Sequence, residues 1–215
     1  MRRTAHKPTL TVLAAVAVTL LSGCGDTGVV TSPTPTANRE CQRLTNDEVD
    51  TLAADHLTGP DETAIAGLQS CVWHTKDNST AVTVTHVDAS VWATKLPALL
   101  DQVEKGGLAK NEKTQEQLAN VRGVLEAGGS MDAATACQMF STLLEMQGQP
   151  AGTTRSVFFY PTKAHPQAMT GQACENGVFT NVSVARPDLK GTTEEGHRVL
   201  AALISAAGSD GSVNG

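Results

Sequence analysis

The sequence predicts an α+β domain in which helices pack against an antiparallel sheet and two disulfides tie the elements together. Three observations lead to this prediction. Residues 80–87 alternate with a period of two, which is typical of half-buried antiparallel strands, and a second expected strand has Val178, Thr180, Val182 and Val184 on one face. Residues 45–48 and 192–195 are capping boxes, and an apolar stripe follows each of them. Four cysteines lie in the same region, which suits a pair of disulfides.

The first half of the domain is expected to contain two helices and two strands. Within the second strand, Val82 and Val84 should face one side of the sheet and Thr83 and Thr85 the other. The expected elements are a helix that begins at residues 45–48 and ends at Gly59-Pro60, strands over 68–74 and 80–87, a turn at 76–79, and a helix that begins near Pro97 and stops at Gly106-Gly107.

The second half repeats this mixture of helices and strands. Helix starts are assigned from caps, and helix ends from glycines. The expected elements are a polar helix around Leu118, Val121 and Leu125 that ends at Gly128-Gly129, a helix capped by Ser130 with Asp132 in its first turn and Gly148 at its end, strands over 156–160 and 178–184, and a last helix with Val199, Leu200, Leu203, Ile204 and Ala207 on one side.

The two halves resemble each other in element order. Each is expected to run helix, strand, strand, helix, and Gly67–Cys71 weakly matches Gly171–Cys174. Two explanations stay open at this point: an internal duplication, or two independent disulfide-containing units with the same order of elements.

The first 23 residues have the organisation of a secretory signal peptide. A positively charged start precedes an apolar run over residues 10–21, which is shorter than the ~20 residues that cross a bilayer. Leu-Ser-Gly then precedes Cys24, which is the pattern of a bacterial lipobox. The alternative is an ordinary secretory peptide followed by a chance cysteine. The spacing favours a lipoprotein whose residues 1–23 are removed and whose Cys24 is lipidated.

Lipidation at Cys24 would attach a diacylglycerol, and two acyl chains give stable membrane anchoring where one chain is marginal. We therefore expect a protein anchored to the cell membrane on its extracytoplasmic face. Residues 24–40 are rich in Thr and Pro and read as a linker. The domain is expected over residues 41–208, followed by a polar tail over residues 209–215.

The four remaining cysteines are Cys41, Cys71, Cys137 and Cys174. An even number of cysteines in an exported chain predicts two disulfides, and three connectivities are open. Spacing favours Cys41–Cys71 and Cys137–Cys174, because each pair brackets a helix followed by a strand. No Cys-x-x-Cys occurs, so neither a zinc site nor a thiol redox pair is expected.

These motifs together resemble a known family of actinobacterial cell-envelope lipoproteins, grouped as a domain of unknown function. The residues that carry the resemblance are the lipobox, the Thr/Pro linker, Cys41-x-x-Leu44-Thr45-x-x-Glu48-Val49, Cys71-x-Trp73, Ala136-Cys137 and Gln172-Ala173-Cys174. The resemblance implies a small disulfide-bonded α+β domain outside the membrane, and it implies no catalytic residue. A more distant likeness is to the extracellular sensor domains of mycobacterial-type serine/threonine kinases.

Composition narrows the class of partner. After removal of residues 1–23 the chain has 13 Lys and Arg against 22 Asp and Glu, a net charge of −9. Nucleic-acid binding needs a clustered positive surface, so no nucleic-acid partner is expected. The hypothesis is a non-catalytic module that binds an envelope ligand or protein partner. The alternative is an envelope enzyme whose active site follows no recognised motif.

Candidate chemical residues are few. Glu194 and His197 are spaced by three on a helix, but the corresponding metal motif needs a second copy, so a capping glutamate and a surface histidine are expected instead. His74 and His86 lie on neighbouring strands and would need a third ligand to hold a metal. Trp73 and Trp92 are the candidates for a ligand groove, with burial in the core as the alternative. No cofactor, metal or catalytic residue is assigned.

Overall fold

The computed structural model describes residues 39–105, 115–116, 119–120, 122–123, 125–126 and 131–208. The predicted signal peptide, most of the linker and the polar tail lie outside these residues, as do Gly106-Gly107, Leu118, Val121, Gly128-Gly129 and Ser130. The described residues form a six-stranded antiparallel sheet with helices on both faces, which confirms the predicted α+β class.

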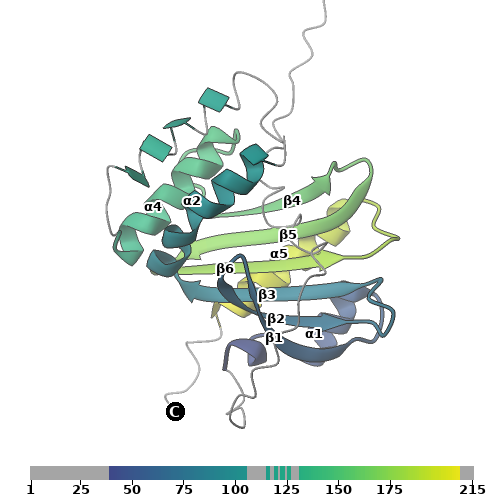
Figure 1. Ribbon diagram of the computed structural model, residues 1–215. Helices are drawn as coiled ribbons and strands as arrows, with labels where there is room; N and C mark the ends of the chain where they lie inside the picture. Colours follow the sequence, from purple (N-terminus) through teal and green to yellow (C-terminus); the bar gives the residue numbers. More distant parts are fainter. Residues whose placement is uncertain are drawn as a thin grey trace, which may run out of the picture.

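The strands follow the order β1-β2-β3-β6-β5-β4 across the sheet, and each neighbouring pair is antiparallel (Figure 1). Their bounds are Thr58–Ile65 for β1, Leu68–His74 for β2, Ala81–Asp88 for β3, Arg155–Pro161 for β4, Pro166–Glu175 for β5 and Val178–Ala185 for β6.

The helices divide between the two faces of the sheet. Figure 1 shows α1 and α5 behind the sheet, and α2 and α4 in front of one end of it. Their bounds are Arg39–Gln42 for the 3-10 helix η3, Asn46–Ala53 for α1, Ala89–Lys105 for α2, Ala133–Met146 for α4 and Thr193–Gly208 for α5.

One face of the sheet, called the valine face here, packs against α1 and α5. In register across β3 and β6, Val82 lies opposite Val184 and Val84 opposite Val182, and all four are buried. A Cβ atom on Gly171 of β5 would lie 3.0 Å from Cγ1 of Val199 in α5. The absence of a side chain at Gly171 therefore lets α5 approach the sheet closely.

The opposite face carries buried polar side chains and is called the polar face. Its six members are Ser70, Thr83, Thr85, Thr170, Asn181 and Ser183. Helices α2 and α4 pack over the end of this face through an aromatic cluster. The Trp92 ring stacks on Phe179 with centroids 4.9 Å apart and meets the edge of Phe140 at 5.6 Å. A second apolar core thus forms at this end.

Three expectations for the first half were wrong. Helix α1 ends at Ala53, where Ala54 adopts the left-handed conformation, and not at Gly59-Pro60, which lies in β1. Strand β1 was not predicted, because its first seven residues are exposed and no alternation marks it. Helix α2 begins at Ala89 and not near Pro97, which lies inside it. The Asp88 carboxylate accepts a hydrogen bond from the Ser90 amide at 2.8 Å, so Asp88 marks the start of the helix that the apolar spacing did not reveal.

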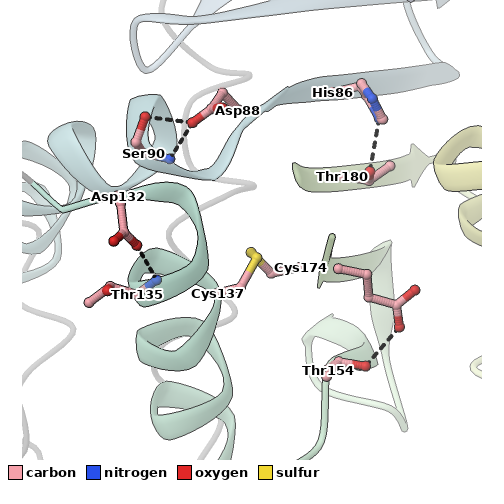
Figure 2. Close-up of a disulfide and its surroundings, with 10 residues drawn as sticks. His86, Asp88, Ser90, Asp132, Thr135, Cys137, Thr154, Cys174 and Thr180 are labelled. Carbon is pink, nitrogen blue, oxygen red and sulfur yellow. Dashed lines mark hydrogen bonds between the residues drawn. A yellow bond between two sulfur atoms is a disulfide. The ribbon is translucent and has the colours of Figure 1, made fainter. Parts of the chain in front are cut away.

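Cap assignments in the second half needed one correction. Asp132 is the N-cap of α4, where its carboxylate accepts from the Thr135 amide at 2.7 Å (Figure 2), and is not a first-turn residue. The helix ends at Met146, two residues before Gly148. Both predicted capping boxes are confirmed, at Thr45–Glu48 and at Thr192–Glu195.

The two halves of the domain have the same order of helices and strands, but the number of strands differs from the prediction. Each half runs helix, three strands, helix, rather than the predicted two strands. A rotation about an axis normal to the sheet exchanges the antiparallel neighbours β3 and β6, but it leaves every element on its own face. Helices α1 and α4 lie on opposite faces. The two halves are therefore not superposable by that rotation, although their strand order is symmetric.

Candidate functional site

The two disulfides have the predicted connectivity. Cys41–Cys71 joins the segment before α1 to β2, with Cα atoms 5.4 Å apart. Cys137–Cys174 joins α4 to β5, with Cα atoms 5.1 Å apart (Figure 2). Cys71 belongs to the core on the valine face and Cys174 to the core on the opposite face. The cysteines therefore tie one helical segment to each side of the sheet.

The predicted tryptophan groove is not formed. Trp73 is 2% exposed in the core on the valine face, and Trp92 is 5% exposed in the aromatic cluster under α2. Trp73 of β2 lies on the valine face, whereas Trp92 of α2 lies over the polar face. The two rings are therefore on opposite sides of the sheet. The alternative expectation, burial in the core, describes both residues.

The histidine candidates do not converge. His74 lies opposite Ala81, and its Nε2 atom is 2.9 Å from Oδ2 of Asp61, whereas His86 faces the other side of the sheet and bonds Thr180 at 3.0 Å (Figure 2). Within the part of the chain that is described, no group of three or more His, Cys, Asp or Glu is placed to hold a metal.

Glu194 forms an ion pair with Arg198 one turn along α5, and the His197 side chain is exposed. This pair has the i, i+4 spacing of a helix-surface interaction. His197 is therefore the expected surface histidine, but Glu194 is not the expected capping glutamate, because the bonds to Thr192 are made by Glu195.

A groove between α1 and α5 is the candidate binding site. Its volume is about 260 Å³, and it opens on the outer side of the two helices. The residues that line it are Asp47, Glu48, Thr51, Leu52, Arg198, Ala201 and Ala202. Small alanines on α5 leave the space, because a larger side chain at either position would fill it.

The chemistry of the groove is an apolar floor between charged rims. Leu52 and Ala202 are buried at its base, and Asp47 and Arg198 are exposed on opposite helices. Ile204 is 48% exposed on α5, one turn from Ala201, so apolar surface continues beyond the groove. Such a surface offers contacts to aliphatic side chains and a charge at each edge.

The Glu48 carboxylate is fixed at one end of the groove. Burial raises the pKa of this carboxyl, but hydrogen bonds from the Thr45 amide, Ser205 and the Thr45 hydroxyl outweigh burial, and the pKa lies below its usual value. Glu48 is therefore ionised near neutral pH, and its capping bonds hold it in place. The rim formed by Asp47 and Glu48 presents negative charge.

The size of the groove limits what enters it. Small-molecule sites commonly enclose about 300–1,000 Å³, so this groove is smaller than a site for a drug-sized ligand. Space of this size fits one or two aliphatic side chains of a larger partner. The geometry therefore favours a peptide or protein surface over a free cofactor.

The polar face is a second cluster that the sequence did not identify. Ser70 and Thr85 hydroxyls are 2.8 Å apart, Thr170 and Ser183 hydroxyls are 2.9 Å apart, and Asn181 donates to Ser183 at 3.3 Å. The first two are cross-strand pairs, which each stabilise a sheet by roughly 0.2–1 kcal/mol, whereas Asn181 and Ser183 both belong to β6. These five side chains have hydrogen-bond partners within the polar face, so we assign them to the sheet.

The groove was also absent from the sequence predictions. It depends on two helices that are 140 residues apart along the chain, and no local pattern shows which faces meet. The only local signal is the pair of small residues Ala201 and Ala202 between Leu200 and Leu203.

No protein-family model, no curated protein and no solved structure matches this chain. Among the helices of the described residues, none is both long enough and apolar enough to span a bilayer.

Proposed function

We propose that this chain is a lipid-anchored, extracytoplasmic protein of the cell envelope that binds a peptide or protein partner in the groove between α1 and α5. The groove, with its apolar floor and charged rims, is the observation that carries the binding role. Membership of the actinobacterial envelope lipoprotein family, which the cysteine and lipobox motifs favour, is part of the same proposal.

The disulfides support an extracytoplasmic location. Disulfides persist in oxidising compartments and are rare in the cytosol of mesophiles. The lipobox at Cys24 supplies the anchor in this proposal, and the signal peptide supplies export. A domain linked to a diacylglycerol by a Thr/Pro-rich segment would stand away from the bilayer, where an acidic protein is repelled by anionic lipids.

The anchor is tested by Cys24→Ala in the native host. The variant should lose the acyl modification by mass spectrometry and leave the detergent phase in a Triton partition. Retention in the detergent phase would contradict lipid anchoring, and the groove would be unaffected by that result.

The partner should be peptidic, with aliphatic side chains and neighbouring basic residues. Aliphatic side chains match Leu52 and Ala202 on the floor, and basic residues match the rim at Asp47 and Glu48. The net charge of −9 on the processed chain would speed the approach of a cationic partner, and added salt should slow it.

The binding role is tested by filling the groove. Ala201→Arg places a long side chain in it, and His197→Arg adds the same residue to an exposed position on the same helix. Chemical crosslinking on intact cells followed by affinity purification should recover the same partner with wild type and His197→Arg, and lose it with Ala201→Arg. Equal recovery by both variants would overturn the groove as the binding site.

A further inference from the structure

Strand β4 is an outer edge of the sheet, and among the described residues no strand pairs with its outer side (Figure 1). The Cys174 amide donates to the Thr154 carbonyl at 2.9 Å, in the same register that pairs β4 with β5. In an antiparallel ladder, hydrogen-bonded and non-bonded pairs alternate. Ser156 and Phe158 therefore bond to β5, whereas Arg155, Val157 and Phe159 direct their N–H and C=O groups away from the sheet.

The two edges of this sheet differ in how well they are protected against pairing with a further strand. Strand β1 carries Pro60, Asp61 and Glu62, all exposed, and proline and charge on an edge oppose further strand pairing. Strand β4 has no charged side chain between Arg155 and Pro161, and its five central residues are Ser, Val, Phe, Phe and Tyr. These residues have a high propensity for strands, so β4 is the edge at which pairing with an additional strand is favoured.

The stretch of sequence that contains β4 lacks the acidic residues found in the rest of the chain. No Asp or Glu occurs over residues 146–174, a stretch that contains Arg155, Lys163 and His165. The charge of Arg155 is held by Glu175 through hydrogen bonds of 2.7–2.9 Å, and Lys163 lies 5.5 Å from the Phe159 ring centroid. Two acidic molecules can therefore approach each other here with little repulsion.

We infer that β4 is a self-association edge, at which two copies of this chain pair their β4 strands antiparallel and join their sheets into one. The outward residues are evenly spaced, so one two-fold register pairs all of them. Val157 would lie opposite Val157 of the second copy, and Arg155 opposite Phe159. The contact is isologous and closes after two copies, because each molecule contributes the same edge.

The chemistry favours a second copy over an acidic peptide. The guanidinium of Arg155 is already paired with Glu175, and the Lys163 ammonium lies over the Phe159 ring. Little positive charge therefore remains to attract an acidic strand. The self-pairing register, in contrast, satisfies every outward amide of the edge, and Pro161, which lacks an N–H, falls outside it. This inference is independent of the groove between α1 and α5.

Cysteine crosslinking of the full chain in detergent tests the register. Opposite residues of a hydrogen-bonded antiparallel pair have Cα atoms about 5.5 Å apart, which suits a disulfide. Val157→Cys should give a covalent dimer under mild oxidation. Arg155→Cys should not, because the two copies of residue 155 would be about 13 Å apart at ~3.3 Å per residue. Thr63→Cys on the exposed β1 edge is the control for random collision.

Mass mapping must first show that both native disulfides persist in each variant. A Val157→Cys protein that remains monomeric, or a Thr63→Cys protein that crosslinks equally well, overturns the inference.

Hydrogen exchange on the wild-type chain gives an answer that needs no substitution. The amides of Val157 and Phe159 should exchange rapidly in dilute protein and slowly in concentrated protein, whereas the Phe158 amide should be protected in both because it bonds to β5. Rapid exchange at Val157 and Phe159 at every concentration overturns self-association. Protection of these amides only when another envelope protein is added would also overturn it and would identify β4 as an edge for a different chain.

Discussion

Arg186 and Glu195 form a buried ion pair at the start of α5. The Arg186 Nη2 atom donates to Oε1 of Glu195 at 2.9 Å, and both residues are less than 9% exposed. The Nη1 atom of Arg186 donates to the carbonyl of Ala53, the last residue of α1, at 3.3 Å. One guanidinium therefore joins the end of α1 to the beginning of α5, the two helices that form the groove.

We expect Arg186→Met to be among the most destabilising single substitutions. Removing one partner of a buried ion pair typically costs about 3–5 kcal/mol, because the other charge loses its compensation. Arg198→Met, which removes the partner of Glu194 from an exposed pair, should cost only about 0.3–0.5 kcal/mol. Urea unfolding of the two variants measures both losses. Equal losses of unfolding free energy in the two variants would show that the buried ion pair does not hold α1 and α5 together.

The same carboxyl predicts an acid-sensitive step. Burial raises the pKa of Glu195, but hydrogen bonds from the Thr192 and Lys190 amides and from the Thr192 hydroxyl, together with the Arg186 charge, outweigh it and bring the pKa below 4.5. A depressed folded-state pKa contributes stability above the unfolded value that is lost as the pH falls through the folded value. Glu195→Gln should therefore flatten the fall in stability below pH 4.5, as measured by melting temperature against pH.

His74 is expected to titrate above its ordinary pKa of 6.5. Its Nδ1 atom is 3.0 Å from the Thr75 carbonyl and its Nε2 atom is 2.9 Å from the Asp61 carboxylate, so two acceptors favour the doubly protonated ring. The resulting stability is fully present below pH 6.5 and is lost as the pH rises through the folded-state pKa.

NMR titration of wild type and Asp61→Asn measures this effect. The substitution should lower the pKa of His74 and leave the titration of His56, which pairs with Asp50 elsewhere, unchanged. A pKa of His74 that is indifferent to Asp61→Asn would show that the Thr75 carbonyl alone sets it.

The two disulfides should contribute almost equally to stability. They close loops of 30 and 37 residues, for which the chain-entropy relation gives about 3.6 and 3.8 kcal/mol. Cys41→Ser/Cys71→Ser and Cys137→Ser/Cys174→Ser double variants, compared by urea unfolding, measure each contribution. A difference well above the roughly 0.2 kcal/mol given by loop length would be due to packing, since Cys71 and Cys174 belong to different cores.

Local signals account for what the sequence predicted correctly. The Thr45 and Thr192 capping boxes are short-range hydrogen-bond patterns, and the alternation of Val82 and Val84 with Thr83 and Thr85 follows from the pleat of a strand. Each of these patterns is complete within a few residues, so no tertiary information was needed. The disulfide pairing was also predicted correctly from spacing, although each bridge encloses one strand more than expected: β1 lies between Cys41 and Cys71, and β4 lies between Cys137 and Cys174.

Elements that depend on distant contacts were missed. Strand β1 has an exposed edge and no buried side, so its pairing with β2 leaves no period in the sequence. The start of α2 at Ala89 follows directly from β3, and the alternating pattern concealed it. The groove forms only because α1 packs against α5, and β4 is an edge only because of the order of the strands in the sheet. No short stretch of residues predicts either feature.

A pair of substitutions separates the two sides of α5. The sequence placed Leu203 and Ile204 on one apolar stripe, but the structure buries Leu203 completely and leaves Ile204 48% exposed. Leu203→Ala should cost about 2–5 kcal/mol through lost burial and a cavity, and Ile204→Ala should stay within about 0.5 kcal/mol, as surface changes do. Urea unfolding of both variants measures this contrast.

The same reasoning extends to deletions. Removal of residues 192–215 takes away Leu203, the Glu195 partner of Arg186 and the Ala206 carbonyl that accepts from Arg43 at 3.2 Å. A domain is stable by only about 5–15 kcal/mol, so this deletion should abolish the cooperative unfolding transition. Removal of residues 25–38, a segment without apolar periodicity, should leave the melting temperature nearly unchanged. If Ile204→Ala proves as costly as Leu203→Ala, the exposed side of α5 is covered in solution.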